Sequence, residues 1–130
     1  MKRQMLVHLS LLFILITIVI VFHRQFIAPK ETMASVKLLH LEFEVFGRVQ
    51  GVFFRKYTQQ KAKSINVRGW IRNTEKRTVE GELEGTYETI EAMKMWLQKE
   101  GSPSSRIDQA VFKNERDIQE YSFTGFSIKH

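Results

Sequence analysis

The sequence of 130 residues predicts an α+β domain in which an antiparallel sheet carries two helices on one face. Three patterns support this prediction. Apolar and polar residues alternate from 37 to 46, as in a half-buried strand. Two later segments, 54–64 and 89–101, place apolar residues at helical spacing. Short runs typical of strands lie between and after these segments, giving the order β-α-β-β-α-β with one extra short strand.

The first strand is expected to run through KLLHLEFEVF and to end at Gly47. Because successive side chains of a strand point to opposite faces, the two sets of this segment should face the core and the solvent. The set expected to face inward is Leu39, Leu41, Phe43 and Val45, and the set expected to face outward is His40, Glu42 and Glu44. The helix expected at 54–64 should bury Phe54, Thr58, Ala62 and Ile65.

Two short strands are expected at 67–74 and 78–85, joined by a segment rich in turn-forming residues. This composition predicts a β-hairpin. Val79 and Leu83 should face the core. Glu80, Glu82 and Glu84 should face the solvent.

The second helix is expected at 89–101, with Gly101 as its stop. Its buried stripe should be Ile90, Met93 and Leu97, flanked by Trp96, and Met95 is also assigned to the core. The segments 107–114 and 121–130 are expected to form the final strands. The complete order is that of the ferredoxin-like, split βαβ fold.

An apolar segment precedes the domain, MLVHLSLLFILITIVIVF at residues 5–22. As a helix it would span roughly 27 Å, close to the ~30 Å hydrocarbon thickness of a bilayer. We therefore expect a leader at 1–33 with a signal-anchor-like transmembrane helix, and a domain at 34–130. Two alternatives stay open. One is a cleaved signal peptide with a weak cleavage site around Thr32 to Ala34, and the other is a soluble form that starts at Met33.

The charge distribution bears on location and partners. The net charge is +6, of which residues 1–33 carry +3, leaving +3 for the rest of the chain. Such a charge mildly favours the binding of anionic small molecules, and by itself it does not indicate a nucleic-acid-binding domain. A slight excess of basic residues after the apolar run favours a cytosolic domain, tethered by the leader or soluble if translation starts at Met33. We expect the domain to be monomeric.

The loop GRVQG joins the first strand to the first helix, and Arg55 follows at the helix start. Glycines allow a tight turn that gathers N–H groups, and a helix N-terminus adds unpaired donors and positive partial charge. With the guanidinium of Arg55 this would form a cradle for a phosphate or carboxylate. The alternative is an ordinary tight turn with a solvated arginine. For Asn73 the alternative to a functional role is an Asx turn that begins the hairpin.

Other site chemistries have little support. The chain has no cysteine, which excludes disulfides and thiolate sites. His8, His23, His40 and His130 show no metal-ligand spacing, so no metal is expected. The serines of SPSSRID have no histidine or acidic partner that can be placed beside them, so a serine nucleophile is not expected.

Three motifs resemble those of the acylphosphatase family: FGRVQGVFFR (46–55), GWIRNT (69–74) and GSPSSRID (101–108). The resemblance covers about residues 38–130. It implies a small ferredoxin-like enzyme that hydrolyses acyl phosphates to a carboxylate and phosphate, without metal or cofactor. By position, the catalytic residues would be Arg55 and Asn73. The phosphate-binding loop would be Gly47, Arg48, Val49, Gln50, Gly51 and Val52.

The resemblance implies that Asn73 orients the attacking water, and that an oxygen of the substrate's phosphate takes its proton. The chain departs from the family in its leader and in its ending, Lys129-His130, where relatives tend to end on Arg or Lys followed by Tyr. Two rival interpretations stay open. One is a non-catalytic phosphate- or carboxylate-binding module of the same family. The other is a ferredoxin-like RNA-binding domain, although the aromatic strand motifs such a domain needs are missing.

Overall fold

The structure is a computed structural model, and it describes residues 2–26 and 36–130. The chain separates into two units, Met1–Ser35 and Val36–His130. Helix α1 (Lys2–Phe26) belongs to the first unit, and every other element belongs to the second. The expected domain boundary after residue 33 and the alternative start at Met33 lie outside the described residues.

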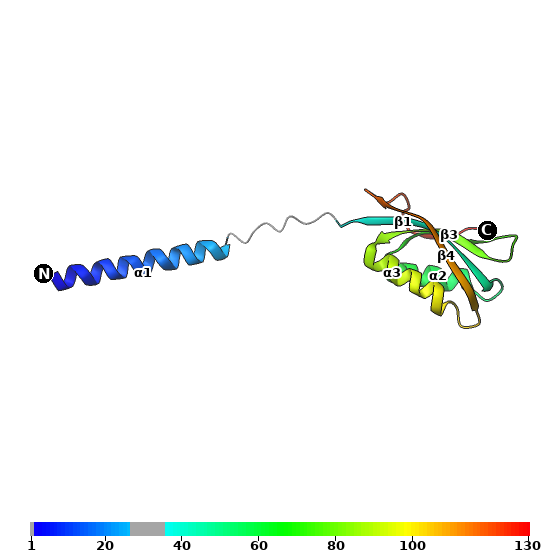
Figure 1. Cartoon of the computed structure of the whole chain (residues 1–130), viewed down its shortest axis with the longest axis horizontal. Coiled ribbons are helices and arrows are strands. Elements are labelled where there is room, and N and C mark those ends of the chain that lie inside the picture. The colour runs from blue at the N-terminus through cyan, green and yellow to red at the C-terminus, as the bar shows by residue number, and fades with distance from the viewer. Residues whose placement is uncertain (1, 27–35) are drawn as a thin grey trace. The chain divides into compact units, whose positions relative to one another are not determined.

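The second unit contains a five-stranded sheet in the order β4-β1-β3-β2-β5. Its strands are β1 (Leu38–Arg48), β2 (Arg68–Asn73), β3 (Val79–Thr86), β4 (Arg106–Ile118) and β5 (Phe126–Ile128). Helices α2 (Phe54–Ser64) and α3 (Tyr87–Met95) cover one face of this sheet (Figure 1). The predicted βαββαβ order with one extra short strand is therefore confirmed.

The sheet is antiparallel as predicted except at one edge, where the short strand β5 pairs parallel to β2. The other three ladders are antiparallel. After β4 the chain crosses to the opposite edge, where Gly69 donates its N–H to Gly125 and Lys129 donates its N–H to Ile71. The strand predicted at 121–130 is accordingly only three residues long, since residues 119–125 make this crossing.

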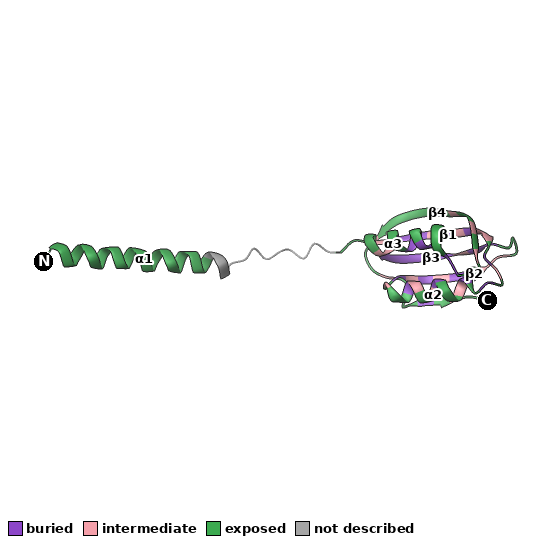
Figure 2. Cartoon of the chain, turned by 90° about the horizontal axis from the view of Figure 1, so that it is seen from below, coloured by how far each residue is buried: buried purple, intermediate pink, exposed green. Residues whose placement is uncertain are grey.

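The hydrophobic core lies between the sheet and the two helices (Figure 2). The sheet contributes Leu41, Phe43, Val45, Ile71, Val79 and Leu83, and the helical layer contributes Phe54, Ala62, Ile90, Met93, Trp96 and Leu97. Met95 corrects the sequence prediction, because its side chain is 58% exposed. At about 100° per residue, Met95 lies roughly 200° around the helix from buried Met93. The helix continues from Trp96 to Glu100 as one π-helical segment, and Gly101 ends it with φ 65°.

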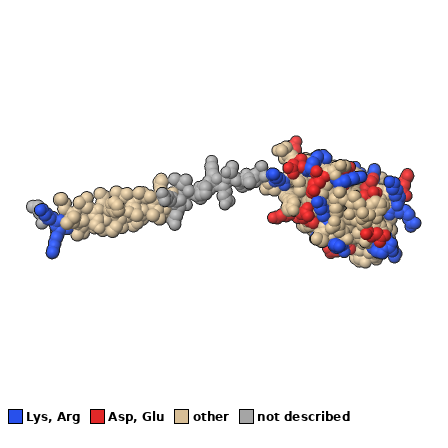
Figure 3. Space-filling model, viewed as in Figure 1, with Lys and Arg blue, Asp and Glu red and all other residues tan. Residues whose placement is uncertain are grey.

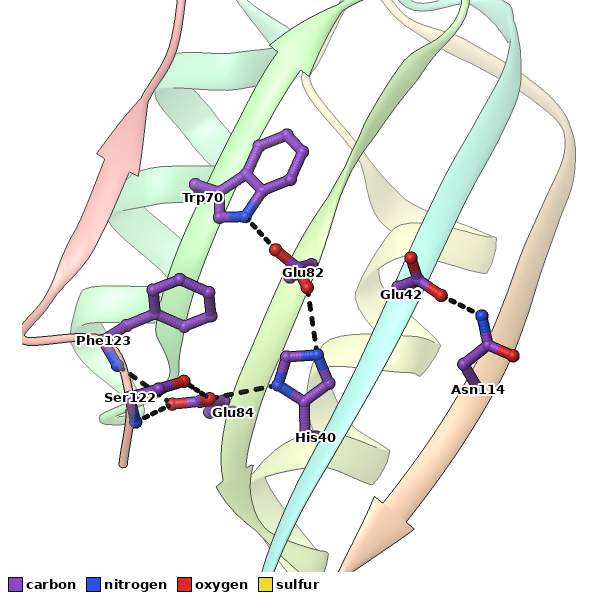
Figure 4. A network of polar contacts seen from close by, with 8 residues as sticks. All are labelled: His40, Glu42, Trp70, Glu82, Glu84, Asn114, Ser122 and Phe123. Atoms are coloured by element: carbon purple, nitrogen blue, oxygen red, sulfur yellow. Dashed lines mark hydrogen bonds and ion pairs between the residues drawn. The ribbon is translucent and has the colours of Figure 1, made fainter. Parts of the chain in front are cut away.

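The outer face of the sheet is less exposed than the alternating pattern predicts. His40 and Glu84 do point away from the helices, yet they are only 3% and 1% exposed. The crossing segment covers them, and Ser122 and Phe123 donate their backbone N–H groups to the Glu84 carboxylate (Figure 4). The His40 ring bridges Glu84 and Glu82, at 3.0 and 3.1 Å. The prediction that Glu84 faces solvent is therefore wrong.

Candidate active site

The end of β1, just before the loop to α2, contains a glycine that no other residue can replace without strain. Gly47 has φ 132°, and a Cβ on it would lie 2.1 Å from the Arg106 carbonyl oxygen of the neighbouring strand. The absence of a side chain lets β1 and β4 approach closely at the point where the chain leaves the sheet. Gly47 thus fixes where the loop starts.

Backbone angles of alternating sign shape the remainder of the loop. Gly51 has φ 71° and Phe53 has φ 59°, whereas Val52 between them is not among the residues with positive φ. Alternation of this kind turns successive N–H groups toward one side and forms an anion-binding concavity. In the part of the chain that the structure describes, the N–H groups of residues 49–53 donate no hydrogen bond. The loop therefore presents several unpaired donors.

Helix α2 adds donors at the same place. Its first backbone hydrogen bond runs from the Tyr57 N–H to the Phe53 carbonyl, at 3.1 Å. The N–H groups of Phe54, Arg55 and Lys56 precede that bond, so helix geometry leaves them without an intrahelical partner. These donors and the helix dipole favour an anion at this end of the helix.

One pocket of about 400 Å³ brings the two predicted catalytic residues together. Arg55 reaches it from the first turn of α2, and Asn73 reaches it from the last position of β2. The lining residues are Val49, Gly51, Phe53, Phe54, Arg55, Lys56, Asn73, Ile128 and His130. Of the predicted phosphate-binding loop, only Val49 and Gly51 line this pocket. Val52 is instead buried in the core.

Asn73 has a buried side-chain oxygen, and among the described residues Oδ1 has no hydrogen-bond partner. The predicted alternative, an Asx turn, would have given it one. The hairpin is instead closed by Thr74, which donates its N–H to the Thr78 carbonyl and accepts the Thr78 N–H on its hydroxyl. A buried acceptor without a hydrogen-bond partner costs about 1–3 kcal/mol of stability. This arrangement therefore suits an oxygen that accepts a hydrogen bond from a ligand or a water molecule.

Two further contacts at the site were not foreseen from the sequence. Gln50 donates its side-chain amide to the carbonyls of Thr74 and Thr78, at 2.9 and 2.8 Å. Nη1 of Arg55 lies 3.5 Å from Nδ1 of His130. Both contacts join segments distant in the chain, and no local pattern indicates them. The first ties the loop to the hairpin that carries Asn73.

A second hollow of about 650 Å³ lies along the same loop and is strongly basic. Its lining includes the predicted loop residues Gly47, Arg48 and Gln50, together with Lys76, Arg77 and Arg106. Asp108 also lines it, and the hydrogen bond from Arg106 holds the pKa of that carboxyl below its ordinary value. This positive charge raises the local concentration of anions around the loop.

The family of the chain follows from comparison with known proteins. Residues 41–128 match the sequence profile of the acylphosphatase family. The chain belongs to the acylphosphatase family. Members of this family are hydrolases that act on acid anhydrides.

Relatives and solved structures of acylphosphatases cover nearly the whole second unit. The chain is 50% identical to acylphosphatase-2 of Gallus gallus over 99 residues, which is 76% of this chain and 96% of that protein. It is 50% identical to acylphosphatase-2 of Homo sapiens over 93 residues, which is 72% of this chain and 94% of that protein. The crystal structure of acylphosphatase from Bacillus subtilis superposes with a TM-score of 0.64 and 29% identity, covering 71% of this chain and 99% of that one.

Proposed function

We propose that this acylphosphatase hydrolyses acyl phosphates without metal or cofactor, with Arg55 and the loop N–H groups binding the phosphoryl group and Asn73 orienting the attacking water. The observation that carries the proposal is the shared pocket. A guanidinium and an amide oxygen line it from two elements, next to a loop of N–H donors, and neither the oxygen nor these donors has a partner among the described residues.

The loop and Arg55 meet the needs of a phosphoryl group. In phosphoryl transfer, negative charge spreads over three equatorial oxygens, and catalysis is largely positioning and charge stabilisation. The N–H groups of residues 49–53 and of the first turn of α2 are fixed donors for two of these oxygens. The planar guanidinium of Arg55 can donate two parallel hydrogen bonds to the same group.

Asn73 meets the needs of the attacking water. Its Oδ1 accepts a hydrogen bond from the water. A lone pair of the water oxygen then points at phosphorus. The water oxygen forms a bond to phosphorus as the bond from phosphorus to the acyl oxygen breaks. The leaving group departs as a carboxylate, and one water proton passes to a phosphoryl oxygen. A carboxylate is a weak base, so the leaving oxygen needs no protonation.

The same pocket would suit the alternative, a module that binds phosphate or carboxylate without turnover. The two functions share the cradle and differ in what Asn73 does. Binding alone requires Arg55 and the loop donors, whereas hydrolysis also requires the acceptor that positions the water. Loss of Asn73 therefore separates the two functions.

The deciding experiment measures benzoyl phosphate hydrolysis by the full chain in detergent micelles, with EDTA present. The variants are Asn73→Ala and, as a matched control, Gln98→Ala, which removes an exposed amide outside the pocket. We expect turnover in the parent and the control, and a loss of about 10²- to 10³-fold in Asn73→Ala, the usual effect of one preorganised polar group. Phosphate binding without turnover in the parent would establish the module instead. Activity that EDTA abolishes would contradict metal independence.

We further propose that α1 anchors this chain in a membrane. Residues Lys2–His23 have a mean hydropathy of 2.9, and within the described part of the chain every residue of that segment is exposed. Its only charged residues, Lys2 and Arg3, lie at its N-terminal end (Figure 3). The Thr17 hydroxyl donates to the Phe13 carbonyl, which satisfies this polar group within the helix. These features suit a helix whose surface faces lipid.

The test for anchoring separates a retained helix from a cleaved signal sequence, since both have this length and composition. Membranes from cells that make the full chain are washed at alkaline pH, and the mass of the retained protein is measured by intact-mass spectrometry. We expect the protein to stay with the membrane at its full mass. A soluble product lacking the first residues would contradict the proposal.

A further inference from the structure

We propose that Phe53 forms the binding surface for the acyl group of the substrate, so that this chain prefers acyl phosphates with aromatic or other large apolar acyl groups over acetyl phosphate. The inference rests on the proposed hydrolysis and names its substrate class.

Phe53 and Phe54 are adjacent in sequence and have different environments. Phe54 is 1% exposed and packs on Trp96, with 5.7 Å between ring centroids. Phe53 is 73% exposed. The core therefore accounts for Phe54 and does not account for Phe53. An exposed phenyl ring gains stability only when an apolar group covers it.

The backbone at Phe53 makes phenylalanine a poor choice for the fold. The residue is the N-cap of α2, with φ 59° and ψ 24°, and its side chain gives the helix no capping bond. Glycine and asparagine adopt this left-handed conformation more readily, and asparagine is among the residues preferred at N-caps, whereas phenylalanine is not. A residue that opposes both local preferences is expected where the side chain serves function.

The position of the ring explains what that function is. Phe53 lines the pocket that holds Arg55 and Asn73, together with the apolar side chains of Val49, Phe54 and Ile128. When the phosphoryl group lies at Arg55, the acyl carbon is one bridging oxygen away. The acyl group must then extend into the remaining space of the pocket. A volume of about 400 Å³ is in the range of pockets that hold small organic molecules.

Aromatic acyl groups should gain the most binding free energy from contact with the Phe53 ring. A phenyl ring packs on another ring in an offset or edge-on arrangement, which adds to the effect of burying apolar surface. The methyl of an acetyl group is too small to cover Phe53. Loss of the contact with Phe53 should therefore change the ratio of kcat/KM for an aromatic acyl phosphate to kcat/KM for acetyl phosphate by about tenfold, the scale of a missing apolar contact in a binding pocket.

The experiment compares benzoyl phosphate with acetyl phosphate on the full chain in detergent micelles. Phe53→Gly removes the ring and also removes the left-handed strain, so it should fold. Phe53→Asn is a second variant that suits this conformation. The control is Tyr87→Ala, which removes an aromatic ring that is 65% exposed and does not line the pocket.

We expect Phe53→Gly and Phe53→Asn to raise KM for benzoyl phosphate about tenfold, with KM for acetyl phosphate changed less than about twofold. The kcat values should change little, because both substitutions remove only the phenyl ring and keep the backbone N–H of residue 53 that donates to the phosphoryl group. Tyr87→Ala should leave the ratio of the two kcat/KM values unchanged. The inference is overturned if the ratio is the same in the parent and in both Phe53 variants.

A binding measurement separates this inference from the proposed function. Benzylphosphonate and methylphosphonate carry the same anionic group and cannot be hydrolysed. We expect calorimetry to show tighter binding of benzylphosphonate to the parent, and equal binding of the two to Phe53→Gly. If no acyl phosphate turns over, hydrolysis is wrong, and the phosphonate ratio still decides the role of Phe53. Equal binding of both phosphonates to the parent contradicts the inference even if hydrolysis is observed.

Discussion

The side-chain amide of Gln50 donates a hydrogen bond of 2.9 Å to the carbonyl oxygen of Thr74, the residue after Asn73. The same amide donates to Thr78 at 2.8 Å. Through these bonds the loop that begins at Gly47 and the hairpin that carries Asn73 keep a fixed separation. Because a site must hold its groups to within about half an ångström, we infer that Gln50 positions the loop donors relative to Asn73.

Gln50→Ala should therefore weaken phosphate binding and lower kcat/KM by about tenfold, the effect of a small misplacement in a positioned site. The control is Gln59→Ala, which removes a similar amide bond of 2.9 Å to the Phe126 carbonyl. Both variants should lose about 1 kcal/mol of unfolding free energy. Only Gln50→Ala should raise the Kd for inorganic phosphate in a calorimetric titration. Equal phosphate affinity in the two variants would count against a positioning role.

Arg55 should be needed for its shape as well as its charge. Arg55→Ala is expected to lower kcat by about 10²- to 10³-fold. Arg55→Lys should recover only part of this loss, because an ammonium group cannot make two parallel bonds to a phosphoryl group. The matched control is Arg72→Ala, since Arg72 precedes Asn73, is half-exposed and pairs with Glu80 at 2.6 Å. Steady-state kinetics should leave this control within about twofold of the parent. Full activity in Arg55→Lys would show that charge alone suffices.

The sequence predicted the elements of the domain well because their signals are local. Alternation marked β1, helical spacing marked α2, and the glycine at 101 marked the end of the second helix. The resemblance to the acylphosphatase family implied that Arg55 and Asn73 serve one site, and both residues line one pocket.

Met95 failed on the local geometry of its helix, whereas the other features that the sequence did not reveal depend mainly on contacts between distant segments. Glu84 follows the alternation of β3, yet Ser122 and Phe123 cover it from a crossing segment 38 and 39 residues later. The bond from Gln50 to Thr78 spans 28 residues, and the sequence FF does not indicate the left-handed backbone of Phe53. Periodicity reports the face of a strand or helix, and it does not report what later packs on that face.

Gly47 and Gly51 should respond differently to the same substitution. Gly47→Ala places a Cβ at 2.1 Å from the Arg106 carbonyl in a backbone conformation with φ 132°. We expect it to lower the unfolding free energy by about 3 kcal/mol or more, since backbone strain and a backbone clash combine. A Cβ on Gly51 meets no atom within 4 Å, so only its left-handed φ of 71° is unfavourable. Gly51→Ala should lose about 1–2 kcal/mol. Urea denaturation measures the unfolding free energy of both variants. Equal losses would contradict the additional clash expected at Gly47.

The carboxylate of Glu84 should make stability depend on pH in the acid range. Burial alone would raise its pKa, but the hydrogen bonds from Ser122, His40 and Phe123 together hold the pKa below its ordinary value of 4.5. Figure 4 shows these groups converging on the carboxylate. A carboxyl whose pKa is lower in the folded state stabilises the fold above its unfolded pKa. That contribution is lost as the pH falls through the folded pKa.

Glu84→Gln should therefore lower the unfolding free energy at pH 7 by about 1–3 kcal/mol or more, because it removes the charged acceptor of several buried hydrogen bonds. The difference from the parent should shrink as the pH falls from 4.5 through the lowered folded pKa, because below that lowered pKa the folded parent also carries a protonated carboxyl at this position. Glu80→Gln is the control on the same strand, where the carboxylate is partly exposed and pairs with Arg72. It should change stability by less than about 1 kcal/mol at any pH. Urea denaturation at a series of pH values tests both variants, and a pH-independent loss in Glu84→Gln would show that its charge does not stabilise the fold.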